Sequence, residues 1–269
     1  MNISEPRTKK MRGAGIMIKR ERLNIIMGML QQKPTVTVNE LANNLDASTS
    51  TIRRDLLTLQ SEGKVLRSYG SAELSSSDNI ELSYLFRKQE HEREKQTIAE
   101  IASTFLGNNQ ALFIDSSSTA SFLAPYLAPL ENVIVITNGL RVAAALDNIP
   151  SVKTYLTGGA LKYRSGSLLG ETSIEYVDDF NADLFFFSGV GVTPGYVFMS
   201  SQRQSVLKRE MVARARKSIL LVDHSKFGKR GFYRLMPTNR VAAVITDAKP
   251  AADFMTFAQK SDIEVLYDE

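Results

Sequence analysis

The first seventy residues place apolar side chains at helical spacing and then change to a short extended pattern. Three segments each keep one apolar face and predict short helices: residues 19–31, 38–45 and 49–62. Ser48 is a good N-cap for the third helix, and Gly63 is positioned to end it. Two short strands are expected next, at residues 64–67 and 72–74. Three helices followed by a hairpin predict a winged helix-turn-helix over residues 18–74.

Beyond Gly107 the pattern becomes an alternation of short apolar runs and helical stretches. The runs predict strands at residues 111–114, 133–137, 152–156, 184–187, 219–222, 241–246 and 264–266. The stretches predict helices at residues 119–128, 139–147, 171–179, 201–216 and 251–260, after a longer helix at 87–106. Such alternation predicts βαβ units and therefore an α/β domain with a largely parallel sheet over residues 87–269.

Two segments lack periodicity and are expected to join or precede these domains. Residues 75–86 are rich in Ser and Asp near their start and are expected to be a linker. Residues 1–17 are expected to be a disordered basic tail, and translation could begin at Met17, directly before the first helical pattern.

Composition narrows the class of protein. A chain of 269 residues with 43% hydrophobic content suits two globular domains. No apolar run approaches the roughly 18 residues that cross a bilayer, and no secretory signal is evident, so we expect a cytoplasmic protein without membrane contact. The absence of cysteine excludes disulfides and thiolate chemistry, and two histidines are too few for a His-rich metal site. No metal and no cofactor are expected.

Charge is concentrated at the front of the chain. Residues 1–70 hold 12 Lys and Arg against 6 Asp and Glu, a net of +6, which leaves 33 − 12 = 21 basic and 29 − 6 = 23 acidic residues elsewhere. The asymmetry indicates a segment that binds a polyanion, joined to a nearly neutral body. A solvated basic tail is the alternative.

The third predicted helix decides between these interpretations. Ile52, Leu56 and Leu59 would face a small core, which leaves short hydroxyls and two arginines outward, a combination that suits docking in the DNA major groove. The candidate DNA-binding residues are Ser48, Thr49, Ser50, Thr51, Arg53 and Arg54 on the helix, with Lys64 and Arg67 on the wing. The alternative is that the arginines are exposed helix charges paired with Asp55 or Glu62, but the whole pattern favours double-stranded DNA.

Polar and small residues follow several strands of the predicted sheet. Four consecutive hydroxyl residues, 116–119, come directly after a strand and open a helix, where unpaired N–H groups favour an anion. Helix capping alone is an alternative for these hydroxyls. Because ligands bind beyond the carboxyl ends of parallel strands, we expect an anion site there. The candidates are Asp115, Ser116, Ser117, Ser118, Thr119, Thr137, Asn138, Gly158, Gly159, Gly189 and Gly191.

Other classes of ligand are not indicated. Pro194 interrupts a dinucleotide fingerprint after Gly191, and no Walker A sequence is present, so neither NAD nor ATP is expected. Lys208 could supply a counter-charge for a sugar phosphate, or could equally be an exposed helix charge. His224 is expected to be a hydrogen-bonding loop residue rather than a metal ligand.

Several strings resemble the DeoR family of bacterial transcription regulators. In the first domain they are residues 20–22, 38–42, 48–56 with the Thr51-to-Leu56 run most telling, Gly63 and Arg67. In the second they are residues 115–119, Thr137, Asn138, Gly158, Gly159, residues 167–170, Asp183, Gly189, Gly191, Lys208 and residues 223–228. Ala47, the 69–72 run, Ser117 and Gln204 depart from the family's usual residues.

The resemblance carries expectations about fold and site. It implies an effector domain similar in fold to ribose-phosphate isomerase, which senses phosphorylated sugars or related metabolites. It adds Gly170, Asp223, His224 and Lys226 to the candidate effector-binding residues.

These observations together predict a transcription regulator, a repressor of carbohydrate-metabolism genes that works as a homo-oligomer, a dimer or a tetramer, and not an enzyme. One alternative is a sugar-phosphate isomerase or deaminase with an appended DNA-binding domain, in which Asp115, Asp183 and Lys208 would do acid–base work. A DNA-binding structural protein without a ligand is the other.

Overall fold

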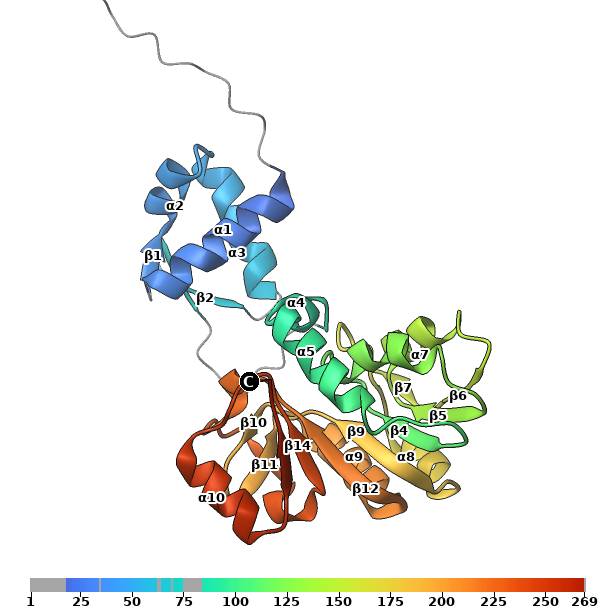
Figure 1. Ribbon diagram of the computed structural model, residues 1–269. Helices are drawn as coiled ribbons and strands as arrows, with labels where there is room; N and C mark the ends of the chain where they lie inside the picture. The colour runs from blue at the N-terminus through green and yellow to red at the C-terminus, as the bar shows by residue number, and fades with distance from the viewer. Residues whose placement is uncertain (1–17, 34, 62–63, 69, 75–83, 269) are drawn as a thin grey trace, which may run out of the picture. The chain divides into compact units, whose positions relative to one another are not determined.

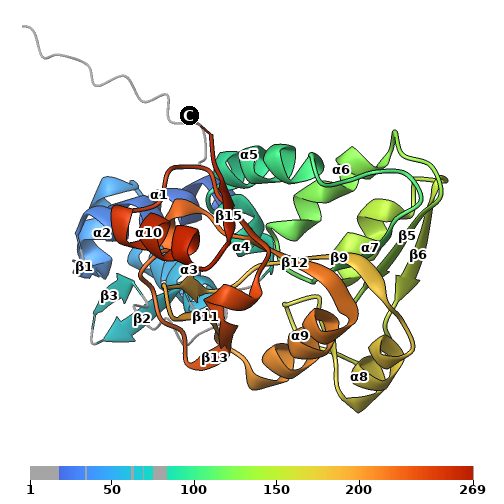
Figure 2. The same ribbon diagram turned by 60° about the horizontal axis from the view of Figure 1, so that its bottom comes forward.

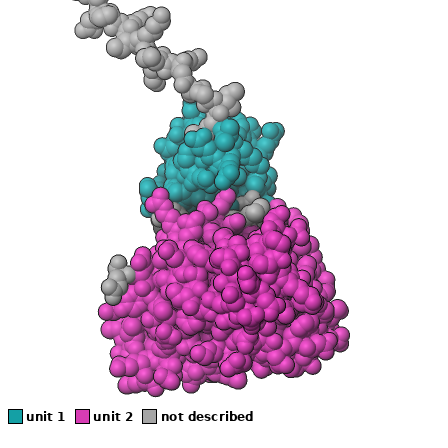
Figure 3. Space-filling view, turned by 45° about the vertical axis from the view of Figure 1, so that its right-hand side comes forward, with its two compact units in different colours: residues 1–76 teal, residues 77–269 magenta. Residues whose placement is uncertain are grey.

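The computed structural model describes residues 18–33, 35–61, 64–68, 70–74 and 84–268. The chain divides after Ser76 into two compact units, which are distinguished by colour in Figure 3. Residues 1–17, most of the expected linker, Pro34, Glu62 and Gly63 lie outside the described residues, so the predictions made for them are not tested here.

The first unit is built from short helices and a small antiparallel sheet. Its elements are α1 (Lys19–Gln32), β1 (Thr35–Thr37), α2 (Val38–Asn44), α3 (Thr49–Ser61), β2 (Val65–Ser68) and β3 (Ser71–Leu74). The strands have the order β1-β3-β2, and β1, which the sequence did not predict, pairs with β3. The helices pack through the predicted apolar faces, with Ile26, Leu41, Ile52 and Leu56 fully buried.

The second unit contains a seven-stranded sheet in which every neighbouring pair of strands is parallel. Across the sheet the strands are β15 (Glu264–Leu266), β14 (Ala243–Ile245), β12 (Ala215–Leu221), β9 (Ala182–Phe187), β4 (Ala111–Ile114), β5 (Val133–Thr137) and β6 (Val152–Leu156). Figure 1 shows them fanned through the unit. The seven predicted strands are thereby confirmed, with small changes of boundary.

Helices cover both faces of this sheet, as Figure 2 shows. One layer consists of α8 (Glu171–Asp178), α9 (Gln202–Arg214) and α10 (Ala252–Lys260). The other consists of α5 (Glu92–Ser103), the 3-10 helix η1 (Ala120–Leu123), α6 (Ala124–Leu127) and α7 (Leu140–Leu146). Alternate strand residues enter the two cores: Phe113 and Phe185 face the first layer, and Leu112 and Phe186 face the second. Burial on both faces explains why the strands are apolar throughout.

Smaller elements complete the second unit. They are α4 (Tyr84–Gln89), β7 (Ala160–Leu161), β8 (Leu168–Leu169), β10 (Gly191–Val192), β11 (Tyr196–Met199), β13 (Tyr233–Pro237), η2 (His224–Lys226) and η3 (Thr238–Arg240). β7 pairs with β8, and β10, β11 and β13 form an antiparallel sheet.

Three predicted elements differ from those observed. The expected helix 119–128 is one 3-10 turn followed by one α-helical turn. The expected helix 87–106 is divided into α4 and α5 at His91, whose φ of 52° is left-handed and cannot continue a helix. The expected linker 75–86 ends sooner, because α4 already begins at Tyr84.

Within the described ranges, no helix is long and apolar enough to span a membrane.

Candidate functional site

The first candidate site is the N-terminal end of α3. Ser48 caps this helix: its hydroxyl accepts a hydrogen bond from the Thr51 amide at 3.1 Å and lies 2.8 Å and 2.9 Å from the Ser50 and Thr51 hydroxyls. Thr49 is exposed beside them. The capping expected of Ser48 is confirmed, and the start of α3 presents a compact group of hydroxyls.

Arg53 and Arg54 lie one turn further along α3, and both are exposed. Asp55 does not pair with them. It points inward and receives Arg22 of α1 in a two-pronged ion pair, with Nε at 2.5 Å and Nη2 at 3.3 Å. The alternative in which Asp55 neutralises the arginines is therefore wrong. Glu62, the other suggested partner, lies outside the described residues.

The helix-turn-helix is completed by α2 and the wing. A capping box holds the start of α2, because the Thr37 hydroxyl accepts from the Glu40 amide at 3.1 Å while a Glu40 carboxylate oxygen accepts from the Thr37 amide at 2.8 Å. Lys33 also contacts Glu40, and these hydrogen bonds lower the pKa of Glu40 to about 2. On the wing, Arg67 is exposed and Lys64 is half-buried.

The second candidate site lies at the carboxyl ends of the parallel strands. Asp115, directly after β4, is fully buried and organises this edge. Its carboxylate accepts from the amides of Ser117 at 2.8 Å and Ser188 at 3.1 Å. The Lys208 ammonium of α9 lies 2.6 Å from Asp115 and donates to the Ser188 carbonyl at 2.6 Å. Lys208 is thus buried and paired, so the alternative of an exposed helix charge is wrong.

A chain of buried polar side chains joins β4, β5 and α9 at the same edge. The Asn138 carbonyl oxygen accepts from the Ser116 amide at 3.1 Å. The hydroxyls of Ser116 and Ser165 each lie 2.7 Å from that of Ser167, which also accepts from the Gln204 amide nitrogen at 3.2 Å. These groups satisfy one another, as buried polar groups must.

Residues 116–119 are between 4% and 8% exposed, and their four hydroxyls have different roles. The Ser117 hydroxyl accepts from the Ala120 amide at 3.2 Å, which confirms capping for this residue. Ser116 belongs to the polar chain above. Among the residues that the structure describes, neither the amides nor the hydroxyls of Ser118 and Thr119 have a hydrogen-bond partner. This pair therefore retains four donor groups at a strand end.

The glycines expected in this site have backbone roles. Gly159 and Gly170 have φ values of 110° and 117°, which favour glycine. A Cβ on Gly191 would meet the Lys229 carbonyl, so the close approach of the loop before β13 requires a glycine there. The Thr137 hydroxyl accepts from the Gly139 amide at 3.0 Å, and the Gly158 carbonyl accepts from the Ser173 hydroxyl.

Asp223, His224 and Lys226 form a separate cluster beyond β12 and β14. His224 Nδ1 lies 2.6 Å from Asp247, and this hydrogen bond is the main reason why the pKa of His224 is raised. The ring of His91 lies edge-on, 5.4 Å from that of His224. Desolvation would raise the pKa of Asp223, but attraction by Lys226, the Ser225 hydrogen bond and the charges of His91 and Lys95 together lower it.

Asp183 lies away from both clusters. It is the second residue of β9 and accepts from the Ala111 amide at 3.0 Å, at the amino end of the sheet. An acid–base constellation of Asp183 with Asp115 and Lys208, which the enzyme alternative needs, is therefore absent from the described structure.

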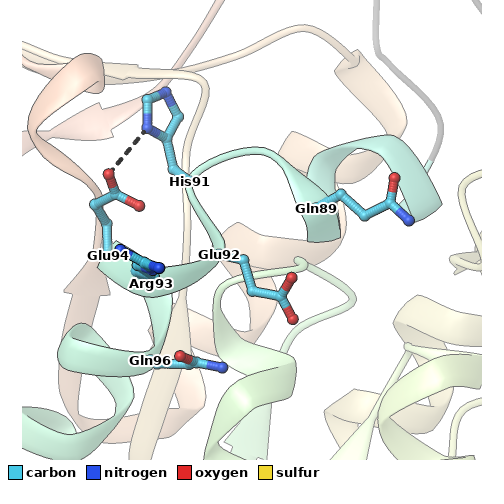
Figure 4. Close-up of a pocket in the computed structure, with 6 residues that line it drawn as sticks. All are labelled: Gln89, His91, Glu92, Arg93, Glu94 and Gln96. Atoms are coloured by element: carbon cyan, nitrogen blue, oxygen red, sulfur yellow. Dashed lines mark ion pairs between the residues drawn. The ribbon is translucent and has the colours of Figure 1, made fainter. Parts of the chain in front are cut away.

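A surface pocket of about 480 Å³ lies beside the second cluster, at the start of α5 (Figure 4). Its described lining is entirely polar, from Gln89 to Gln96, and includes His91 paired with Glu94 at 3.5 Å. Among the described residues, no group of three or more His, Asp and Glu is arranged to hold a metal ion.

Several members of these sites were not predicted as such. They are Tyr84, His91, Lys95, Ser121, Ser165, Ser167, Ser188, Gln204 and Asp247. Most of these contacts, such as Tyr84 to Ser121 and His224 to Asp247, join residues 23 or more positions apart, and contacts of that kind leave no signal in the local sequence.

The geometry defines a class of protein in which a DNA-reading helix is joined to a parallel α/β domain with a polar strand-end edge. Two family models match the chain: the DeoR-like helix-turn-helix domain over residues 22–78 and the DeoR C-terminal sensor domain over residues 90–248. The chain belongs to the DeoR family of transcription regulators. It is a regulator rather than an enzyme, as the sequence predicted.

Relatives align over almost their whole length. The regulator GolR of Listeria innocua is 35% identical over 85% of this chain and 91% of its own. The glycerol-3-phosphate regulon repressor of Escherichia coli is 31% identical, with 89% and 95% covered, and the repressor GlcR of Bacillus subtilis is 28% identical, with 94% and 98% covered. A solved D-ribose-5-phosphate isomerase bound to phospho-erythronic acid is 14% identical over 51% of this chain and 54% of that chain, with a TM-score of 0.39.

Proposed function

We propose that this regulator is a repressor of carbohydrate-metabolism genes, and that a phosphorylated sugar bound at the carboxyl edge of the sheet controls its affinity for operator DNA. The observation that carries the proposal is the pair Ser118 and Thr119, which present two amides and two hydroxyls without described partners a few residues after Asp115, the partner of the buried Lys208. A phosphate dianion needs such a set of donors. That two relatives are repressors, one of a glycerol-3-phosphate regulon, supports the same assignment.

Each side chain of the site has a defined part in binding. The phosphate accepts hydrogen bonds from Ser118 and Thr119, and Lys208, held 2.6 Å from Asp115, supplies the positive charge next to the loop. The side-chain amides of Asn138 and Gln204 and the hydroxyl of Ser167 belong to the polar chain at the same edge and suit hydroxyl groups of a sugar. Asp223, His224 and Lys226 are proposed to bind the effector as well, from the neighbouring strand ends.

The DNA half of the proposal assigns base and phosphate contacts to α3. Arg53 and Arg54 are exposed one turn after the hydroxyl group at the start of α3, so they can bridge guanine edges or clamp phosphates. Lys64 and Arg67 contact the flanking backbone from the wing. Helix-turn-helix proteins read two half-sites as dimers, so we propose a homodimer or a homotetramer as the active species.

Regulation then requires only a difference in affinity. If the effector binds the DNA-free arrangement of the oligomer better than the operator-bound one, occupancy of the operator falls without any chemical step.

Ligand binding by the full chain tests the sensor half. We expect ribose 5-phosphate, glucosamine 6-phosphate or glycerol 3-phosphate to raise the unfolding temperature of the second unit, while the unphosphorylated counterparts do not. The double variant Ser118→Ala, Thr119→Val should weaken that binding at least tenfold, because hydrogen bonds to a charged group are lost. The matched control is Thr256→Val, at an exposed position of α10. An identical response of wild type to phosphorylated and unphosphorylated sugars would contradict the proposal.

A further inference from the structure

The first residue of helix α4, Tyr84, is hydrogen-bonded to Ser121, close to the proposed phosphate-binding pair Ser118 and Thr119. The Tyr84 side chain is buried, and its hydroxyl donates to the Ser121 hydroxyl at 2.8 Å. The Ser121 hydroxyl in turn donates to the carbonyl of Ser118 at 2.7 Å. A continuous chain of two hydrogen bonds therefore connects α4 to one of the two residues that retain free donors.

Tyr84 also contacts the loop that carries the buried residues Ser165 and Ser167. The Tyr84 amide donates to the Arg164 carbonyl at 2.9 Å, next to Ser165 in the polar chain. Along α4, the Lys88 ammonium lies 5.6 Å from the ring centre of Phe122 in η1. The start of α4 thus bridges two loops at the carboxyl edge of the sheet.

The far end of α4 is held by Lys95, whose charge interacts with the cluster of Asp223, His224 and Lys226. The Lys95 ammonium, on α5, donates to the carbonyls of Arg87 and Glu90, the groups that the end of a helix leaves without partners. Lys95 is only 4% exposed, and desolvation lowers its pKa to about 8, against the attraction of Asp223. Repulsion by Lys226 lowers the pKa of Lys95 further. Lys95, which holds the end of α4, therefore shares one electrostatic environment with residues 223–226.

A helix of six residues is too short to be stable alone. Its position therefore depends on these contacts, which are made by Ser121 and Lys95, two residues that adjoin the proposed effector site. Residues 75–83 connect α4 directly to β3, the last element of the DNA-binding unit.

We propose that α4 reports the state of the effector site to the DNA-binding unit, with Tyr84 as the positioning residue that couples them. The inference rests on the proposed function. A phosphate on Ser118 and Thr119 shifts the Ser118 carbonyl, which alters the hold of Ser121 on Tyr84 and so the position at which the chain leaves toward β3.

Hydrogen exchange of the full chain tests the coupling without knowledge of the sugar. The probe is inorganic phosphate at 100 mM against chloride of equal ionic strength, because phosphate is common to all proposed effectors. In wild type we expect slower exchange at residues 116–121 and a changed rate at residues 84–89.

The variant Tyr84→Phe keeps the ring and removes the hydroxyl. In this variant we expect the slower exchange at residues 116–119 to remain. The change at residues 84–89 should fall about fivefold, the effect of one neutral hydrogen bond. Tyr163→Phe, on a side chain that is 80% exposed, is the control and should behave as wild type.

The outcomes separate the two proposals. A response at 116–119 without any response at 84–89, or one that Tyr84→Phe leaves unchanged, overturns the coupling and leaves the proposed site intact. No response of wild type at 116–119 rejects the phosphate site and removes the trigger of the coupling with it. If Tyr84→Phe unfolds α4 outright, Ser121→Ala interrupts the same chain from the other side, and an undiminished response at 84–89 in that variant is again contrary to the coupling.

Discussion

At the scale of single residues, the decisive features are charges whose partners are far away in the sequence. Asp55 shows this in the DNA-binding unit. Its side chain is 2% exposed and is held by Arg22 from another helix, which keeps the neighbouring arginines of α3 free to face solvent. The exposed arginine surface of α3 thus depends on a buried ion pair.

Arg22→Met should destabilise the first unit by about 3 kcal/mol, because it leaves a buried carboxylate without its partner. Urea unfolding followed by a probe in the first unit measures this. The double variant Arg22→Met, Asp55→Leu removes both charges and should recover most of the loss. If the single variant costs no more than the double, Asp55 is not buried as described.

Arg53→Ala and Arg54→Ala together should lower the affinity for specific operator DNA by at least tenfold, since each arginine contact to a base contributes about 1–3 kcal/mol. Both side chains are exposed, so the unfolding temperature should stay the same. Lys260→Ala on α10 removes an exposed charge elsewhere and serves as the control in a fluorescence anisotropy titration. Unchanged operator affinity in the double variant would exclude α3 as the reading helix.

His224 should titrate above its ordinary pKa of 6.5 because Asp247 favours its charged form. The stability that this pair contributes is complete below pH 6.5 and is lost as pH rises through the raised pKa of the folded protein. The contribution is small, since the His224 side chain is 51% exposed. Proton NMR can follow the titration of His224. The variant Asp247→Asn should lower the pKa of His224. A pKa of His224 that Asp247→Asn does not change would contradict the assigned cause.

At the scale of elements, the pattern of apolar residues predicted helices and strands well where the element packs against a hydrophobic core along its whole length. α2, α3 and the strands of the large sheet are of this kind. It did not predict the sheet of β10, β11 and β13; β10 has only two residues and carries no periodic signal, and the four and five residues of β11 and β13 were not recognised as strands. Nor did it predict the break at His91, because the left-handed residue there is not a glycine and so has no recognisable signal in the sequence.

The capping box of α2 gives an element-scale prediction. Thr37→Ala should destabilise the first unit by about 1 kcal/mol, the usual cost of losing an N-cap side chain. Because the pKa of Glu40 is lowered from 4.5 to about 2, its contribution is present above pH 4.5 and is lost as pH falls toward 2. Circular dichroism of wild type and Glu40→Gln between pH 5 and 2 checks this. Parallel curves for the two proteins would show that Glu40 does not cap the helix.

At the scale of the whole molecule, the order of domains and the class of fold could be predicted, and so could most residues of the strand-end site. Asp115, Ser116, Asn138 and Lys208 come together as expected because parallel strands end at one edge. The buried contacts that complete the strand-end site could not be predicted. Ser167 and Gln204 enter through loop and helix contacts over 30 or more residues, as in the bond from Gln204 to Ser167, and such contacts have no local signature.

The strand positions show that the grouping of Asp183 with Asp115 and Lys208 as acid–base candidates is wrong. Its position near the start of β9 places it at the opposite edge from Asp115, which lies just beyond the end of β4. The strand predicted at residues 184–187 already began after Asp183, so the strand pattern itself gave no reason to group Asp183 with Asp115.

The central claim is that anion binding at the carboxyl edge of the sheet lowers the affinity of α3 for DNA. The most direct measurement is the dissociation constant for the DNA upstream of the protein's own gene, titrated with each phosphorylated sugar of the panel above. We expect at least one to raise it five- to 150-fold in wild type and not in Ser118→Ala, Thr119→Val. A dissociation constant that no phosphorylated sugar changes, or that changes equally in the variant, would contradict the account.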